Sequence, residues 1–463
     1  MLDSLIQQIS GLSPIKIYGT VSAIHGLILT VKIKNKSIRI GSRCVIQLNH
    51  SKQEQNVPTS ETNLQGEVVG FEDNHVLVMP FGTVVGINPG CPVLFESSVA
   101  SIKPTAKWCG RVINALADPI DDLGPLDHGF QEYPLQTNPI PSNQRARVID
   151  RIDVGIRAVN TFLTCCKGQR LGIFAGSGVG KSMLLSMFAR HTACDVCVIG
   201  LIGERGREVK DFIEETLGPD GLKKSVLVVA TSDESPLMRR QAANLTLCIA
   251  EYFRDQGLSV LCLMDSVTRF AMAQREIGLS AGEPPTTKGY PPSTFAELPK
   301  LLERAGPGID YNIHSNAFNH KGVSHKTGYI TALFTVLVDG DDMNEPIADA
   351  VRGTLDGHIV LDRSIAERGR FPAINILRSV SRTVPACHSS EEQEIVKRAR
   401  SYISTYEDMA DMIRLGAYRA GSNAEVDQAI TFSPQISSFL SQTPNELTSI
   451  EHSFSNLKSI LFK

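Results

Sequence analysis

The feature that most constrains the fold is a regular alternation in the middle of the chain. After Pro104, apolar runs of strand length alternate with amphipathic segments of helix length. The runs are "LGIFA" near 171, "VCVIGLI" near 196, "VLVVA" near 226, "VLCLMD" near 260 and "YITALFTVLV" near 329. Strands that are apolar along their whole length are typical of parallel sheets covered by helices on both faces. The alternation therefore predicts an α/β fold with a largely parallel sheet over residues 99–388.

Differently patterned regions flank this sheet. Over residues 15–98, apolar residues recur at every second position, as in "LTVKIK", and turn residues separate the runs. This pattern predicts a small β-barrel, interrupted by a polar loop from about His50 to Gln65. Residues 389–463 have helical patterns and no further strand-length run, so we expect a helical C-terminal domain.

The first residues, "MLDSLIQQISGL", have the pattern of an amphipathic helix over residues 1–14. Its apolar face would carry Leu2, Leu5, Ile6, Ile9 and Leu12. A signal peptide would need a basic leader and an unbroken apolar core, and this segment has neither. A helix this short is marginal alone. Packing against its own domain and docking on a partner both remain open.

The composition argues against several classes of protein. A net charge of −3 gives no sign of a nucleic-acid-binding coat or of a polybasic membrane arm. No apolar run approaches the length of a membrane span. The ten cysteines lack a repeating spacing, and the single CxxC pair, Cys194 and Cys197, has no second pair to complete a zinc site. We therefore expect a protein of the reducing cytosol.

The segment "AGSGVGKS" follows the first of these apolar runs and begins a helical run, which is the context of a phosphate-binding loop. Its glycines let successive backbone N–H groups point at a phosphate. The lysine would reach the β and γ oxygens of a nucleotide, and the hydroxyl after it would bind Mg²⁺. An alanine stands at the first position in place of glycine, which matters only if that residue needs a positive φ. The predicted nucleotide-binding residues are Ala175, Gly176, Ser177, Gly178, Val179, Gly180, Lys181 and Ser182.

A carboxylate ends another of these apolar runs. Asp265 follows "VLCLM", where a buried charge would be costly without a partner. Mg²⁺ coordination beside the phosphate loop would supply that partner. Capping of the following helix by Asp265 or Ser266 is the structural alternative, and it is compatible with metal binding.

A cluster of oppositely charged residues, "GERGREV", follows the apolar run "VCVIGLI". Glu204 is the candidate to orient the water that attacks a γ-phosphate. Glu208, one helical turn later, would help order the Mg²⁺ shell, and Arg205 would steady either carboxylate. The alternative is a surface ion-pair cluster at the start of a helix.

Several long segments together resemble a known family. They are "GSGVGKS", "GERGREV", "MDSVTRFAMAQREIGLSAGEPPTTKGYPPSTFAELPKLLERAG", "VLVDGDDMNEPIADAVRGTLDGHIVLDR" and "SVSR". They look like the bacterial flagellar protein-export ATPase, in the type III secretion ATPase group related to the β subunit of rotary F-type ATP synthases. The resemblance is dense from about Gly110 to Arg382. It implies an N-terminal β-barrel, a RecA-like ATPase domain and a helical C-terminal domain that assemble into a homohexamer and hydrolyse ATP with Mg²⁺.

The resemblance also implies roles for single residues. Glu204 matches the catalytic carboxylate, and Asp265 matches the Mg²⁺-associated aspartate. Arg269 stands at the arginine position of D-x-x-x-R. Arg382 matches the arginine that is presented to the γ-phosphate of the neighbouring subunit. Phe371 occupies the place of an aromatic residue, usually tyrosine, that packs on adenine.

Partners and a location follow from the same resemblance. It implies that the N-terminal helix docks on a stalk-like regulatory protein, and we expect Leu5, Ile6 and Ile9 to make the contact. It further implies a central stalk-like coiled-coil protein, export-gate membrane proteins and complexes of export chaperones with their substrates. The implied location is cytoplasmic and peripheral, at the inner membrane beneath the export apparatus. No nucleic-acid partner is expected.

Three other functions compete with flagellar export. An injectisome ATPase often has the loop ending GGGKS, whereas "GVGKS" and "TRFAMAQREIGLSAGEPP" favour the flagellar branch. A non-catalytic ring subunit of a rotary ATPase would lack the equivalent of Glu204. A hexameric RNA helicase would need a basic, aromatic-rich N-terminal domain, which this barrel is not.

One segment departs from the family. "IDYNIHSNAFNHKGVSHKT" is longer than the short link expected there, and it contains His314, His320 and His325. Their spacing fits no metal signature. We therefore expect a flexible insertion in a loop over about residues 310–327.

Overall fold

The apolar runs of the middle of the chain form one nine-stranded sheet in the computed structural model, which describes residues 17–33, 37–48, 63–96, 99–310, 326–338, 340 and 342–462. In sheet order the strands are β17 (Val380–Ser381), β16 (Gly357–Val360), β10 (Arg170–Ala175), β15 (Tyr329–Leu337), β13 (Ser259–Asp265), β11 (Val196–Glu204), β12 (Ser225–Thr231) and β8 (Val112–Asn114), and β14 (Gly306–Pro307) pairs with β15. All pairs are parallel except β16–β17 and β14–β15. The prediction of a largely parallel sheet is confirmed.

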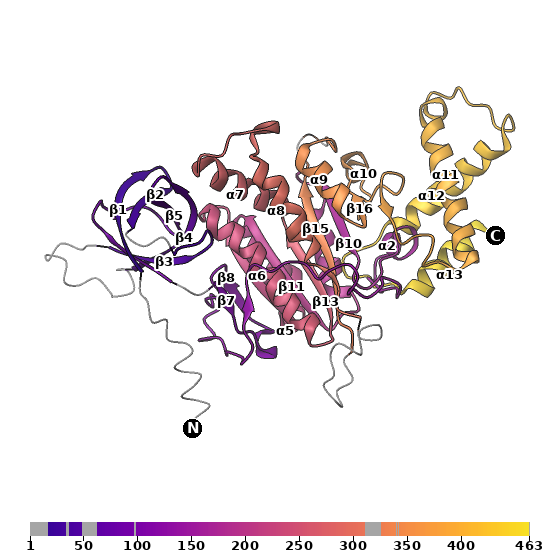
Figure 1. Cartoon of the computed structure of the whole chain (residues 1–463). Coiled ribbons are helices and arrows are strands. Elements are labelled where there is room, and N and C mark those ends of the chain that lie inside the picture. Colours follow the sequence, from indigo (N-terminus) through magenta and orange to yellow (C-terminus); the bar gives the residue numbers. More distant parts are fainter. Residues whose placement is uncertain are drawn as a thin grey trace.

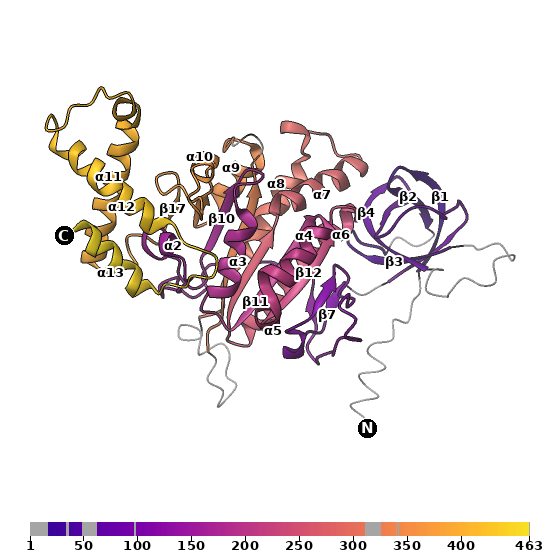
Figure 2. The same cartoon turned by 180° about the vertical axis from the view of Figure 1, so that it is seen from behind.

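Helices cover both faces of this sheet (Figures 1 and 2). They are α3 (Lys181–His191), α4 (Gly206–Asp211) and α5 (Gly218–Lys223) on one face, and α6 (Pro236–Asp255), α7 (Val267–Ser280), α8 (Pro292–Glu303) and α9 (Pro346–Thr354) on the other. Side chains alternate between the two faces along β11. Ile199 and Leu201 belong to the core on the α3 side, whereas Val198 and Ile202 belong to the core on the α6 side. This two-sided burial explains why the central strands are apolar without interruption.

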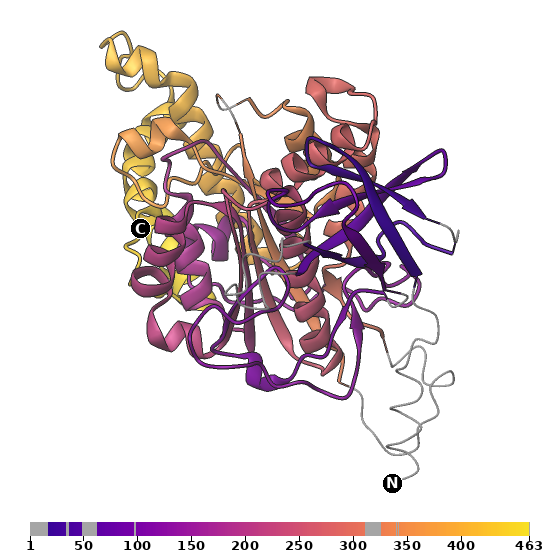
Figure 3. The same cartoon turned by 90° about the vertical axis from the view of Figure 1, so that its left-hand side faces the viewer.

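A closed barrel of six strands forms the N-terminal end of the described chain (Figure 3). In barrel order these are β1 (Ile17–His25), β2 (Ile28–Ile33), β5 (His75–Pro80), β4 (Asn63–Glu72), β3 (Arg43–Gln47) and β6 (Pro92–Phe95), and β6 pairs with β1. The predicted barrel is confirmed. Because β4 begins at Asn63, residues 63–65, which were expected in the polar loop, belong to a strand.

The C-terminal part consists of α11 (Ser390–Arg414), α12 (Ala424–Leu440) and α13 (Ile450–Leu461), as the helical patterns predict. It lies at the opposite end of the molecule from the barrel (Figure 1). Its apolar side chains share one core with α2 (Arg157–Phe162) and with the α3 face of the sheet. The chain enters this part through a capping box, in which Ser389 and Glu392 each accept from the backbone N–H of the other.

Short elements complete the described chain. They are β7 (Ser101–Ile102), β9 (Tyr133–Pro134), α10 (Arg363–Glu367) and helical turns at Ala106–Trp108, Phe212–Leu217 and Thr287–Gly289. All ten cysteines are free thiols. Within the described segments, no three His, Cys, Asp or Glu side chains are grouped to hold a metal, and no helix is long and apolar enough to cross a membrane.

Three predictions lie outside the described residues. They concern the helix over residues 1–14 with its apolar face, the polar loop up to residue 62, and the three histidines of the insertion. The predicted domain boundaries likewise stay predictions.

Candidate active site

The predicted site residues come together where three parallel strands end. β10 ends at Ala175, β13 at Asp265 and β11 at Glu204. These strands run in the same direction, so their carboxyl ends meet at one edge of the sheet. The sheet therefore brings together segments that are up to 90 residues apart in the sequence.

The phosphate loop begins directly after β10 and leads into α3. Gly178 and Gly180 have φ values of +78° and +94°, a left-handed conformation that favours glycine. Val179, only 1% exposed, anchors the loop in the core. Ala175 ends β10 and is not among the residues with positive φ. The replacement of glycine by alanine at that position therefore causes no backbone strain.

Lys181, the first residue of α3, bridges two carboxylates. Its Nζ donates to Glu204 Oε1 at 3.0 Å and to Asp265 Oδ1 at 2.5 Å. The three side chains are 12%, 15% and 7% exposed, respectively. Burial lowers the pKa of Lys181, but the two carboxylates outweigh it, so this pKa is raised overall. Burial raises the pKa of Asp265, and Lys181 opposes that effect.

A pocket of about 260 Å³ lies beside this triad. Its polar lining includes Ser182, Glu204, Glu208 and Asp265, which are the residues expected to handle the metal and the water. Arg205 is expected to steady either carboxylate, but it pairs with Glu208 at 3.3 Å, and its side chain is 80% exposed. Arg205 therefore lies at the rim of the site.

Arg269 lies in the first turn of α7, close to a bulge in β11 at Gly203, just before Glu204. Ser266 caps this helix, since its Oγ accepts from the backbone N–H of Arg269, so the capping role falls to Ser266. The aliphatic part of Arg269 packs on Gly203, whose φ is +69°. A Cβ on Gly203 would lie 2.8 Å from Cγ of Arg269. Arg269 thus supports the bulge at the end of β11 that precedes the candidate base.

Phe371 and Arg382 occupy different places. Phe371 is half-buried, and its ring lies 3.4 Å from where a Cβ on Gly180 would be, so it borders the phosphate loop. Arg382 is exposed and follows β17. Its backbone N–H donates to the carbonyl of Asp356, beside the first residue of β10. The length of β10, about 20 Å, separates Arg382 from the phosphate loop of its own chain.

Comparison with known proteins decides the family. Family models match residues 21–96 (ATP synthase alpha/beta family, beta-barrel domain), 155–381 (the nucleotide-binding domain of the same family) and 388–459 (T3SS EscN ATPase C-terminal domain). The flagellum-specific ATP synthase of Caulobacter vibrioides is 56% identical over 460 residues, 99% of each chain. The chain belongs to the flagellum-specific ATP synthase family.

Other members of this family and solved structures agree. The flagellum-specific ATP synthase of Bacillus subtilis is 45% identical over 99% of this chain and 98% of its own. The assembled ATPase EscN of the enteropathogenic E. coli type III secretion system matches with a TM-score of 0.84 at 37% identity, over 96% of this chain and 100% of that one. EscN in complex with its central stalk EscO matches with a TM-score of 0.81 at 38% identity, over the same shares. The predicted class, an ATPase of the type III export group, is confirmed, and so is the preference for its flagellar branch.

Two residues that contact the candidate site were not predicted from the sequence. Thr335 on β15 is fully buried and donates to Asp265 Oδ1 at 2.6 Å. Arg363 donates to the carbonyl of Ser177 in the phosphate loop at 3.0 Å. Thr335 had a detectable signal, since a buried hydroxyl near the carboxyl end of a largely apolar run needs a hydrogen-bond partner. Arg363 had none, because its contact depends on how β16 lies against β10.

Proposed function

We propose that this chain hydrolyses MgATP as a homohexameric ring of the flagellar type III export apparatus and so energises or assists the export of flagellar proteins. The observation that carries the proposal is the Lys181 ammonium, held between Glu204 and Asp265 at the end of the phosphate loop. Three charges from three different elements are largely buried there. Such an arrangement is costly for stability alone and is typical of sites that act on a charged ligand.

The proposed chemistry uses these residues in distinct roles. Lys181 and the backbone N–H groups of the loop bind the outer phosphates of ATP. Glu204 holds the attacking water and accepts its proton. Phe371 stacks on the adenine from beside Gly180. Arg269 holds the bulge before Glu204 in place.

The residues present fit a Mg²⁺ ion. The hydroxyl of Ser182 and the carboxylates of Asp265 and Glu208 border one pocket, and Mg²⁺ in phosphoryl-transfer sites uses one or two carboxylates together with substrate phosphates. When bound, Mg²⁺ supplies charge neutralisation at the phosphates.

Ring assembly completes the site in this proposal. Arg382 lies at the far end of β10 from its own phosphate loop, which supports a role at the γ-phosphate of the neighbouring subunit. The likeness to EscN, which was solved as an assembled ATPase, supports the ring. An arginine supplied in trans is worth roughly 10³ to 10⁵ in rate.

The proposal includes partners and a place in the cell. A central stalk-like coiled-coil protein is supported by the likeness to EscN bound to its central stalk EscO. We further propose a stalk-like regulatory protein on residues 1–14, export-gate membrane proteins, and chaperone–substrate complexes as partners. The ring would lie in the cytoplasm, peripheral to the inner membrane beneath the export apparatus.

The test is ATPase activity per subunit as a function of protein concentration, with and without RNA. We expect a cooperative rise with concentration, because each site needs an arginine from its neighbour, and no effect of RNA. Lys181→Ala serves as the inactive control. No turnover at any concentration would indicate a non-catalytic ring subunit, and dependence on RNA would indicate a helicase.

A further inference from the structure

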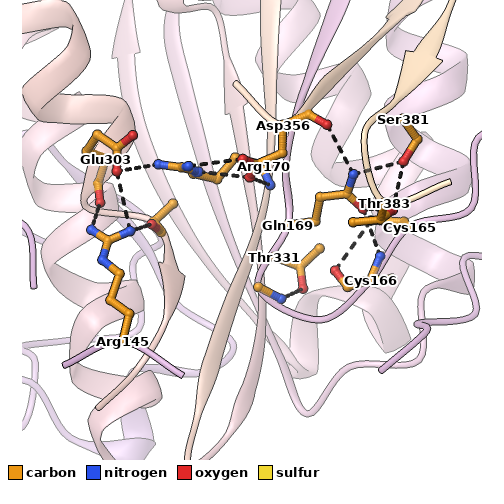
Figure 4. A network of polar contacts seen from close by, with 12 residues as sticks. Arg145, Cys165, Cys166, Gln169, Arg170, Glu303, Thr331, Asp356, Ser381 and Thr383 are labelled. Atoms are coloured by element: carbon orange, nitrogen blue, oxygen red, sulfur yellow. Dashed lines mark hydrogen bonds and ion pairs between the residues drawn. The ribbon is translucent and has the colours of Figure 1, made fainter. Parts of the chain in front are cut away.

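Both neighbours of Arg382 in the sequence, Ser381 and Thr383, make hydrogen bonds to the buried side chain of Gln169 and to the carbonyl of Thr164. Gln169, fully buried, immediately precedes β10. Its Nε2 donates to Ser381 Oγ at 2.9 Å, and its Oε1 accepts from Thr383 Oγ1 at 3.2 Å. Figure 4 shows the amide of Gln169 directed at these two hydroxyls. Hydrogen bonds therefore fix the segment that carries the exposed arginine on both sides of Arg382.

Gln169 itself has little freedom to move. Its Oε1 also accepts from the backbone N–H of Cys166 at 2.9 Å, and its own N–H donates to the carbonyl of Cys166 at 3.0 Å. Its carbonyl accepts from the N–H of Ala332 at 3.0 Å. A primary amide is the neutral side chain that donates on one side and accepts on the other. No apolar side chain of similar size can replace it.

A second set of contacts ties the same segment to β10. The N–H of Arg382 donates to the carbonyl of Asp356 at 2.9 Å. The carboxylate of Asp356 accepts from the backbone and the guanidinium of Arg170 at 3.0 to 3.1 Å. Arg170 pairs in turn with Glu303 at 2.5 Å (Figure 4). The arginine-bearing segment is thus fixed to the first residue of the strand that ends at the phosphate loop.

We infer that Gln169 is a positioning residue for Arg382, setting the direction in which one subunit presents this arginine to the next. The inference rests on the proposed role of Arg382 in trans. Because the Arg382 side chain is exposed, the rest of the subunit positions this residue through its backbone. A misplacement of about 1 Å at a reacting centre costs roughly 10²-fold in rate. Gln169 therefore acts on the neighbour's site and not on its own.

The experiment uses mixed rings. One subunit type carries Glu204→Gln and supplies only an arginine, whereas the other carries Arg382→Ala and supplies only an intact site. Mixing the two should restore hydrolysis at interfaces where an intact site meets an intact arginine. Gln169→Met, which keeps the volume and removes the hydrogen bonds, is then placed in one subunit type at a time.

We expect Gln169→Met to lower the restored kcat by 10-fold to 100-fold when it is in the arginine-supplying subunit, at unchanged KM. The same substitution in the site-supplying subunit should leave the restored rate unchanged. Thr383→Val in the arginine-supplying subunit should reproduce the loss, and Thr383→Ser, which keeps the hydroxyl, should not. Thr383→Val also keeps the inference testable if Gln169→Met does not fold.

The matched control is Thr331→Val. Thr331 is buried and lies beside Gln169 (Figure 4), and its Oγ1 accepts from the N–H of Gly168. Among the described residues, no hydrogen bond joins its side chain to residues 381–383. We expect full restored activity with this variant. Equal losses from Gln169→Met in either subunit type, or no loss in the arginine-supplying subunit, would overturn the inference. Failure of the parent mixture to regain any activity would instead overturn the trans role of Arg382, and the inference with it.

Discussion

Glu204 and Asp265 share Lys181, but their surroundings suit them to different tasks. Asp265 Oδ1 accepts from both Lys181 and Thr335. Among the described residues, the side chain of Glu204 accepts one hydrogen bond, from Lys181 to Oε1. Glu204 borders the pocket with its second oxygen uncommitted, so it can accept a hydrogen bond from water. This difference supports the proposed roles, with Asp265 on the metal side and Glu204 as the base that takes the proton from water.

Glu204→Gln tests that division of roles. The substitution is nearly isosteric and removes the proposed base, so we expect the single-turnover rate of ATP hydrolysis to fall roughly 10²-fold to 10⁴-fold. Binding of MgATP, followed with a fluorescent analogue, and ring formation should be retained.

Glu234→Gln is the matched control. Glu234 is a half-buried carboxylate just after β12, at the same edge of the sheet, and it does not line the pocket beside Lys181. The Glu234→Gln variant should hydrolyse ATP at the normal rate. Normal turnover by Glu204→Gln would reduce the "GERGREV" stretch to a charged helix start.

A bulge at Gly203, one residue before the end of β11, controls how Glu204 enters the site. Gly203 takes a left-handed φ there, and the stem of Arg269 fills the space where a Cβ would be. The strand pairing is irregular at the same point, since the register of β11 with β12 shifts between Ile202 and Glu204. The shift lets the strand leave its regular alternation, so that Glu204 lies beside Lys181.

Gly203→Ala should therefore damage both stability and activity. A side chain in the left-handed region costs about 1–3 kcal/mol, and the displaced Arg269 would let the bulge shift. We expect a lower melting temperature and a lower kcat, measured by thermal unfolding and steady-state hydrolysis. Gly206→Ala is the control, because nothing lies within 4 Å of a Cβ on Gly206, its φ is not positive, and alanine favours the start of α4. A melting temperature unchanged by Gly203→Ala would contradict this account of the bulge.

On the scale of the whole molecule, the phosphate loop and Arg382, the two parts of the proposed catalytic site, lie at opposite ends of β10. The phosphate loop follows the end of this strand, and the segment with Arg382 is bonded to its start. In one subunit, Arg382 therefore lies too far from the phosphate loop to act on a nucleotide bound there. If Arg382 acts on the neighbouring subunit, as proposed, hydrolysis depends on ring assembly.

Arg382→Ala should separate binding from turnover. We expect nucleotide binding to be unchanged and the concentration-dependent activity to be lost, by about 10³-fold or more. Binding is measured on the same preparation as steady-state hydrolysis across protein concentrations. Arg352→Ala is the control, since Arg352 on α9 is half-exposed and pairs with Asp349 one helical turn away. Retention of assembly-dependent activity by Arg382→Ala would remove this residue from the mechanism.

Local patterns were sufficient where the physical cause is local. The uninterrupted apolar runs indicated the parallel sheet, the two-residue period indicated the barrel, and the glycines around Lys181 indicated the phosphate loop. Each of these depends on burial or on backbone freedom within a few residues. The family resemblance added the expected roles of Arg269, Phe371 and Arg382, which no short-range pattern carries.

Contacts between distant segments depended on the tertiary structure. The bond from Thr335 to Asp265 spans 70 residues, and the bond from Gln169 to Ser381 spans 212. The order of the strands in the sheet brings these residues together. This order cannot be predicted from the apolar pattern, because many arrangements of the same strands bury the same apolar faces. The sequence by itself thus determined which residues could do chemistry. The packing of β10, β15 and β16 decided which of them meet, and it placed Gln169 against the residues on either side of Arg382.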